Sequence, residues 1–275
     1  MNFIPVPQGA SAAHWRNLLF LAALTAIGLT ASPARATLIT YAEYHLGEAG
    51  SLGTNNLPQD SSGNARNLVT DISGSVAVTG NASFHPNAGG STAYLDTTPA
   101  GNQGWYSSAL FTSLPTDNFA FGVFARTSAI ASGDVFTVGG SNGSFKLSLG
   151  ANGWAASAHN VAWISTASGV TGSFTADTWV HLALIRAAGQ TTFYINGVAS
   201  SPAYAGAPVN DTPHIAVSPG GATYFSGLID EARVVTFTAG ESTANIINAL
   251  QAVPEPSTAL LGVFGTLALL MRRKR

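Results

Sequence analysis

Carboxylates are the side chains of this chain best suited to catalysis, and their spacing limits what they can do. A glycosidase needs two carboxyl groups facing each other across a cleft, about 5–5.5 Å apart in retaining enzymes and about 6.5–9.5 Å apart in inverting ones. Asp230 and Glu231 are the only adjacent acids in the span 37–252. Neighbouring residues of a regular strand point to opposite faces, so these two are not expected to address one substrate. His181 has no serine or acid beside it and the chain has no cysteine, so the sequence favours a non-catalytic protein over a glycosidase.

A loop rich in oxygen atoms offers a second kind of chemistry. Asp60-Ser61-Ser62-Gly63-Asn64 lies within a segment, Glu48 to Asn67, that is dense in Gly, Ser, Asn and Asp. Ca²⁺ takes about 6–8 oxygen ligands from carboxylates, amides and carbonyls, and this loop supplies all three. The same Asp60 side chain could instead close an Asx turn. The ligand spacing does not decide between the two alternatives.

Four aromatic residues are candidates for stacking on a sugar: Trp105, Tyr106, Trp154 and Trp163. The sequence places them in or beside loops, where a flat ring can stack on a pyranose. The alternative is packing in the core, because large aromatic side chains are mostly buried.

The elements that would position these residues are β-strands, and the segment Thr178 to Ser200 indicates this most strongly. Its first arm alternates with a period of two and is apolar on both faces, which predicts a strand covered on both sides. A small, polar turn at 187–190 leads into a second arm rich in β-branched and aromatic residues. Asn196-Gly197 then predicts a second tight turn, since both residues tolerate positive φ.

The remaining patterns predict an all-β fold of two antiparallel sheets. Phe119 to Arg126 and Tyr224 to Val235 are further long strands, and about a dozen short strands are separated by turn signals. The chain has 30 glycines and only 9% charged residues, which suits short strands joined by turns better than helices. Ser242 to Leu250 is the only helical pattern in the body.

The distribution of charge argues against a nucleic-acid partner. Six of the eleven basic residues lie in the two ends of the chain, outside the span 37–252. That span contains five basic and twelve acidic residues, a formal charge of −7. Binding to phosphates requires a basic surface, so nucleic acid is not expected as a ligand.

Residues 1–36 have the pattern of a secretory signal peptide. A positively charged start is followed by the apolar run Leu18 to Leu29 and by Ala34-Arg35-Ala36, an A-x-A cleavage site. The apolar run is shorter than the about 20 residues that span a bilayer. We therefore expect signal peptidase to cut between Ala36 and Thr37, with an uncleaved anchor as the alternative.

Residues 253–275 have three parts, each with a physical role. Pro254-Glu255-Pro256 stays extended, the run Thr258 to Met271 is apolar enough to enter a membrane, and four basic residues end the chain. This arrangement resembles the PEP-CTERM sorting signal of Gram-negative bacteria. The resemblance implies transient anchoring in the inner membrane and processing by an exosortase, which releases the protein to the cell surface or matrix. An ordinary C-terminal anchor is the alternative.

The body of the chain also resembles a known family. The opening strand ends in Leu46-Gly47-Glu48 and is followed in order by the segments DSSGN, FAFGVFAR, WVHLALIR, YINGV and YFSGLIDEARVV and by a short helix. This order resembles the LamG-like jelly roll of the concanavalin A-like lectin/glucanase superfamily. The resemblance implies a domain over 37–252 and a structural calcium ion that ties the N-terminal loop to the last strand, with Asp60 and Asp230 as ligands. Asp230 is alternatively a capped or paired strand acid.

Fold and sorting signal together predict an exported, non-catalytic protein that binds carbohydrate or forms a scaffold in exopolysaccharide or biofilm. A glycoside hydrolase on the same fold is one alternative, since this fold carries lectins, adhesion modules and glycosidases alike. A structural surface protein without a glycan ligand is the other.

Overall fold

The computed structural model describes most of the body of the chain, with gaps. The chain divides into residues 1–36 and 37–275, and the described residues all belong to the second unit. They are residues 37–46, 48, 50–51, 57–68, 70–71, 77–80, 93–97, 105–106, 114–140, 143–158, 162–166, 174–200, 213–218 and 224–252.

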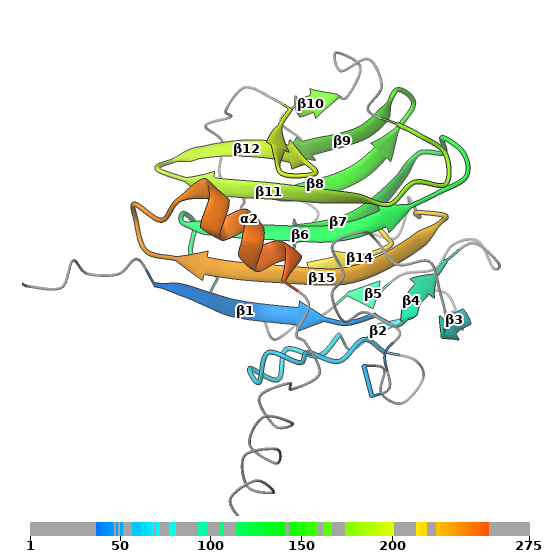
Figure 1. The fold of residues 1–275 in the computed structure, drawn as a ribbon, viewed down its shortest axis with the longest axis horizontal. Helices are drawn as coiled ribbons and strands as arrows, with labels where there is room; N and C mark the ends of the chain where they lie inside the picture. Colours follow the sequence, from blue (N-terminus) through cyan, green and yellow to red (C-terminus); the bar gives the residue numbers. More distant parts are fainter. Residues whose placement is uncertain are drawn as a thin grey trace, which may run out of the picture. The chain divides into compact units, whose positions relative to one another are not determined.

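Two antiparallel β-sheets form the two layers of the domain (Figure 1). The eight-stranded sheet has the order β13-β12-β11-β6-β15-β4-β3, with β1 also paired to β15. Its strands are β1 Leu38–Tyr44, β3 Ala77–Gly80, β4 Ala93–Asp96, β6 Phe119–Arg126, β11 Val180–Ala187, β12 Gln190–Ile195, β13 Val198–Ala199 and β15 Leu228–Phe237. The seven-stranded sheet has the order β10-β9-β8-β7-β14-β5-β2. Its strands are β2 Thr70–Asp71, β5 Trp105–Tyr106, β7 Gly133–Gly140, β8 Gly143–Gly150, β9 Gly153–Ala158, β10 Ala162–Thr166 and β14 Pro213–Ile215. The predicted all-β jelly-roll sandwich is confirmed.

The predicted hairpin is present as β11, β12 and the short β13. Ala188 and Gly189 form the first turn with φ values of 50° and 71°, and Asn196 and Gly197 form the second with φ values of 50° and 79°. Positive φ at both central residues is typical of a type I′ turn, and the twist of this turn matches that of the strands it joins. The turn chemistry in the sequence therefore fixed the register of this edge of the sheet.

Both faces of β11 are buried, as its apolar pattern predicts, but by different partners. Val180, Leu182 and Leu184 point into the main core between the two sheets. Ala183 and Ile185 belong to a second apolar cluster on the opposite face. The main core is filled largely by aromatic rings, for example Phe121 of β6 and Phe136 of β7, which meet edge to face with their centroids 5.4 Å apart.

The second cluster is covered by the helix α2, Thr243–Gln251. Figure 1 shows α2 lying across β11, β6 and β15, all of which it contacts. The hydroxyl of Ser242 accepts a hydrogen bond from Asn245 N at 3.1 Å and caps the helix. Ile246, Ile247 and Leu250 are its buried residues. The predicted helix is therefore confirmed, and it covers the apolar surface that Ala183 and Ile185 present on the outer face of β11.

Candidate functional site

A β-bulge in β15 is the feature that organises the first candidate site. The pairing of β15 with β6 loses its regular register between Asp230 and Arg233, and Glu231 adopts a φ of 48°. The other edge of β15 changes partner at the same place: β4 pairs with Leu228 and Ile229, and β1 pairs with residues 232–237. The bulge therefore lies where three strands meet.

The bulge brings together acids that a regular strand would separate. One carboxylate oxygen from each of Glu48, Asp230 and Glu231 lies within 4.8 Å of the others. The expectation that Asp230 and Glu231 point to opposite faces is therefore wrong. A bulge adds a residue to one strand and re-aims the side chains beside it, and the left-handed backbone of Glu231 turns its carboxylate toward that of Asp230.

We call the surrounding group of ionisable side chains the carboxylate cluster. It comprises Glu43, His45, Glu48, Asp230, Glu231 and Arg233. His45 Nδ1 lies 2.8 Å from Glu231 Oε2, and the Arg233 guanidinium forms an ion pair with Glu43. Among these six side chains, four carboxyl groups face one guanidinium and one imidazole.

Burial makes charge in this cluster costly. Asp230 is 2% exposed and Glu231 is 3% exposed, and Glu231 Oε1 is buried without a hydrogen-bond partner among the described residues. A buried charge that is not compensated destabilises the folded state. Three converging carboxylate oxygens match the preference of a hard cation such as Ca²⁺, and Glu48, Asp230 and Glu231 are the residues that would hold it.

The pKa shifts in the cluster have the same origin. Burial raises the pKa of the Glu231 carboxyl above its ordinary value, although the hydrogen bond and charge of His45 act against it. Burial acts to lower the pKa of His45, but the hydrogen bond and charge of Glu231 outweigh it and raise the pKa overall. Burial lowers the pKa of Arg233 to about 10, so this side chain stays charged near neutral pH. The raised pKa of Glu231 means that the positive charge near it does not offset the cost of burying its carboxylate.

Asp60 does not belong to the carboxylate cluster. Its Oδ1 accepts hydrogen bonds from the backbone N–H groups of Glu43 and Ser62, each at 3.0 Å, and its Oδ2 accepts one from Arg66 N at 2.8 Å. Its own N–H donates to Asn67 Oδ1 at 2.8 Å. Asp60 therefore acts as the Asx-type tie of its loop to β1. Of the two ligands that the resemblance implies, the structure brings Asp230 to the converging carboxylates and gives Asp60 another role.

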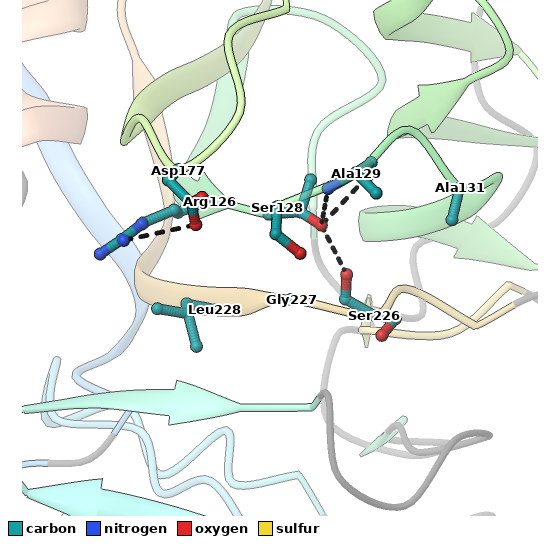
Figure 2. A pocket seen from close by; sticks show the side chains of 9 residues that line it. Arg126, Ser128, Ala129, Ala131, Asp177, Ser226, Gly227 and Leu228 are labelled. Atoms are coloured by element: carbon teal, nitrogen blue, oxygen red, sulfur yellow. Dashed lines mark hydrogen bonds and ion pairs between the residues drawn. The ribbon is translucent and has the colours of Figure 1, made fainter.

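A pocket at one end of the sandwich is the second candidate site, and we call it the rim pocket (Figure 2). Its volume is about 220 Å³, and it is lined by the end of β6, the segment after it, the turn before β11 and the start of β15. The lining residues are Arg126, Thr127, Ser128, Ala129, Ala131, Asp177, Ser226, Gly227 and Leu228. Figure 2 shows Arg126 and Asp177 side by side, with Ser128 next to them and the two alanines beyond it. Arg126 Nη2 lies 3.4 Å from Asp177 Oδ1.

Backbone contacts hold the walls of the rim pocket in place. Asp177 N donates to Thr127 O at 2.9 Å, and the Thr127 hydroxyl lies 3.1 Å from Ser226 O and 3.2 Å from Ala129 O, either of which it can donate to. A Cβ on Gly227 would lie 2.5 Å from Arg126 O. Only glycine allows the segment before β15 to lie so close to the end of β6, and Gly227 is one of the residues that line the pocket.

The four aromatic candidates all lie in strands, and Trp154 is the one among them whose side chain the structure describes. Trp105 and Tyr106 form β5 and Trp163 belongs to β10; their side chains lie outside the described part of the structure. Trp154 belongs to β9 and is fully buried, with its ring centroid 6.1 Å from that of Phe174 and 6.2 Å from that of Phe225. It is a core residue, because burial of so large an apolar ring outweighs its use at the surface.

The two ends of the chain lie outside the described residues. The signal peptide predicted up to Ala36 and the sorting motif predicted at Pro254-Glu255-Pro256 stay predictions, and Thr37 is the first described residue. Within the described part of the chain, no helix is long and apolar enough to cross a membrane.

Several residues of the two sites were missed from the sequence. Glu43 and His45 stand at alternate positions, which signals a shared face, but their partners lie about 190 residues away and no local pattern indicates them. Arg126 and Asp177 are isolated charges in the sequence, and nothing near them predicts that they meet.

The two-layer antiparallel sandwich with a polar pocket at its rim is a lectin-like architecture. The chain belongs to the concanavalin A-like lectin/glucanases superfamily, since the family model Laminin_G_3 matches residues 90–241. No curated protein sequence matches the chain.

Solved structures with a similar fold include carbohydrate-related proteins. Domain 4 of AbnA, a GH43 extracellular arabinanase from Geobacillus stearothermophilus solved with arabinotriose, has a TM-score of 0.54 and 19% identity, and the match covers 78% of this chain and 99% of that one. The binding domain of botulinum neurotoxin serotype D has a TM-score of 0.48 and 12% identity, covering 77% and 50%. Trypanosoma rangeli sialidase has a TM-score of 0.45 and 13% identity, covering 83% and 34%. At these identities the likeness to the arabinanase domain shows the fold alone.

Proposed function

We propose that this chain is an exported, non-catalytic protein that binds carbohydrate in exopolysaccharide or biofilm. The rim pocket is the observation that carries this proposal. It combines an ion pair, side-chain hydroxyls and small apolar walls in one concave site, and a few convergent polar groups in a cavity are the usual form of a small-molecule site. A polyhydroxylated ligand suits such a mixture of donors and acceptors.

The burial of the carboxylate cluster supports a non-catalytic role. Asp230 and Glu231 converge as a glycosidase pair would, but they are 2% and 3% exposed, so a polysaccharide has no access to them. A general acid or base must come within hydrogen-bond reach of the bond it cleaves. These acids are better suited to holding an ion than to hydrolysis, which leaves the glycoside hydrolase as the weaker alternative.

Calcium at the carboxylate cluster is part of the same proposal. Glu48, Asp230 and Glu231 offer converging oxygens, and backbone carbonyls of nearby turns can complete the shell. The ion would neutralise excess charge at the place where β1, β4 and β15 meet. Its role is therefore structural, since the rim pocket does not include any of these acids.

The two ends of the chain are the basis of the proposed localisation. The signal at 1–36 and the Pro-Glu-Pro, apolar and basic segments at 253–275 are the basis for proposing signal peptidase and an exosortase as processing partners. Membrane contact through the C-terminal segment is then transient, and the final location is the cell surface or matrix. Mass spectrometry of the exported protein tests this: a retained Met1 end or an intact Arg275 end contradicts it.

The decisive experiment is binding of the purified full chain to a glycan array that includes exopolysaccharide, with calcium and with chelator. Binding without release of shorter products supports the carbohydrate-binding role. Release of products points to the glycosidase alternative. Absence of binding under both conditions, together with self-association, favours the structural surface protein.

A further inference from the structure

We infer that the rim pocket binds a neutral sugar unit through two adjacent hydroxyl groups, with Arg126 as the donor and Asp177 as the acceptor. This inference rests on the proposed carbohydrate-binding function and specifies its ligand class. It concerns residues that lie outside the carboxylate cluster and that the calcium proposal does not use.

The geometry of the ion pair supports this choice of ligand. Arg126 Nη2 and Asp177 Oδ1 are 3.4 Å apart, and their side chains are 23% and 62% exposed. A contact this long beside a largely exposed carboxylate contributes little to stability, so a ligand hydroxyl can lie between these two atoms at low cost. A hydroxyl group both donates and accepts. Two adjacent hydroxyls can therefore accept from the guanidinium and donate to the carboxylate at the same time.

The charge of the site disfavours an acidic sugar. A uronate carboxylate that approached Arg126 would also approach the carboxylate of Asp177, and like charges in close contact repel. The body of the chain adds to this effect, because residues 37–252 carry a formal charge of −7. A neutral sugar is repelled neither by Asp177 nor by the net negative charge of the body.

The size and walls of the pocket fit one sugar unit. Its volume of about 220 Å³ is below the about 300–1,000 Å³ of sites for drug-sized ligands. Ala129, Ala131 and Leu228 provide small apolar surface, and Ser128 and Ser226 provide further hydroxyls. Figure 2 shows the serines and the alanines beside one another on the same side of the ion pair, with Leu228 below it. A sugar unit likewise has apolar C–H groups and hydroxyls.

The backbone places the acceptor before any ligand arrives. Asp177 adopts a φ of 56°, and its N–H is tied to Thr127 O at 2.9 Å. Asp and Asn are the residues that tolerate this left-handed conformation best after glycine. Asp177→Asn therefore keeps the turn and removes only the negative charge and part of the acceptor capacity, which makes it a clean test.

The test measures affinity of the full chain for neutral oligosaccharides (glucose, galactose, mannose and arabinose types) and for oligogalacturonates, by titration calorimetry. We expect the wild type to bind a neutral oligosaccharide and to bind oligogalacturonates more weakly. Arg126→Gln and Asp177→Asn should each weaken the neutral binding about tenfold or more, the usual effect of losing a hydrogen bond to a charged group. Asp117→Asn is the matched control. Asp117 Oδ1 lies 3.8 Å from Arg186 Nε, just before β6 begins and at the opposite end of that strand from Arg126. This variant should therefore bind the oligosaccharide as the wild type does.

Three results overturn the inference, and they are distinguishable. Neutral binding that is unchanged in both variants leaves the carbohydrate-binding function in place and removes the rim pocket from it. Preferential binding of oligogalacturonates that Asp177→Asn strengthens makes Arg126 an anion site and reverses the ligand class. No binding of any saccharide by a folded wild type, folding being checked by its cooperative thermal transition, removes the proposed function and the inference with it.

Discussion

The carboxylate cluster and the rim pocket begin only two residues apart on β15, yet they are built in opposite ways. Leu228 lines the rim pocket, whereas Asp230 belongs to the cluster and is 2% exposed. The acid in the pocket, Asp177, has a side chain that is 62% exposed. In the cluster the charges are buried and held by several strands, whereas the acid of the rim pocket is exposed and held by a turn.

The difference in burial indicates which of the two sites is suited to reversible ligand binding. Buried charges act on stability, because the cost of removing them from water must be compensated within the fold. An exposed charge such as that of Asp177 is screened and contributes little to stability, so it is available for recognition. We therefore expect substitutions in the cluster to change the free energy of unfolding and substitutions in the rim pocket to change binding.

The largest effect is expected from Arg233→Ala. This change leaves Glu43 buried without its ion pair and removes the hydrogen bond that Arg233 Nη1 donates to Ala249 O of α2 at 2.5 Å. Loss of one partner of a buried pair costs about 3–5 kcal/mol, measured by urea denaturation. The double variant Glu43→Leu/Arg233→Met is the control and should lose less, because Glu43 is then not left as an unpaired buried charge. A loss below 1 kcal/mol in the single variant contradicts the buried character of the cluster.

Removal of calcium should have the next largest effect. At a calcium concentration of 100 times the dissociation constant, a bound ion stabilises the fold by about 2.7 kcal/mol, so chelator should lower the Tm by roughly 2–4 °C for each kcal/mol lost. Asp230→Asn should abolish this response. Asp60→Asn should keep it, although its loop is weakened, because Asp60 lies outside the cluster. A response that survives in Asp230→Asn but disappears in Asp60→Asn reverses the assignment of the ligands.

The pH dependence of the calcium-free protein should show a smaller effect. The pKa values of Glu231 and His45 are both raised in the folded state. Their contribution to stability is therefore complete at low pH and is lost as pH rises, first through the raised pKa of Glu231 and then through that of His45. Denaturation in chelator from pH 4 to pH 8 measures this, and Glu231→Gln should flatten the profile. Stabilisation by added calcium should grow over the same range, and a profile that rises with pH in chelator contradicts the argument.

The smallest effect on stability is expected from Asp177→Asn. The side chain is largely exposed and asparagine accepts the same backbone conformation, so the free energy of unfolding should change by less than about 0.5 kcal/mol. The response to calcium should equal that of the wild type. A loss above 1 kcal/mol in urea denaturation means that the rim pocket, like the cluster, is a structural feature, and the contrast between the two sites disappears.

Local patterns in the sequence are enough to predict the main strands, the helix and the class of fold. The hairpin of β11 and β12, its two turns with positive φ and the helix α2 all appeared where local patterns predict them. The predicted last strand also appeared, as β15. These features depend on residues close together in the chain: alternation of side chains, turn-forming residues and helical spacing act over a few positions. Together they leave a two-sheet sandwich as the way to bury both faces of the central strands.

The positions of the two candidate sites depend on how distant segments pack against one another. The bulge at Glu231 turns neighbouring acids toward each other, and Glu48 joins them from a part of the chain about 180 residues earlier. Trp154 lies in the core because its ring packs against the rings of Phe174 and Phe225. The residues next to Trp154 in the sequence do not indicate these contacts. Arg126 and Asp177 meet because β6 and the turn before β11 end at the same rim. Each of these sites depends on contacts between distant segments, and local propensity carries no information about such contacts.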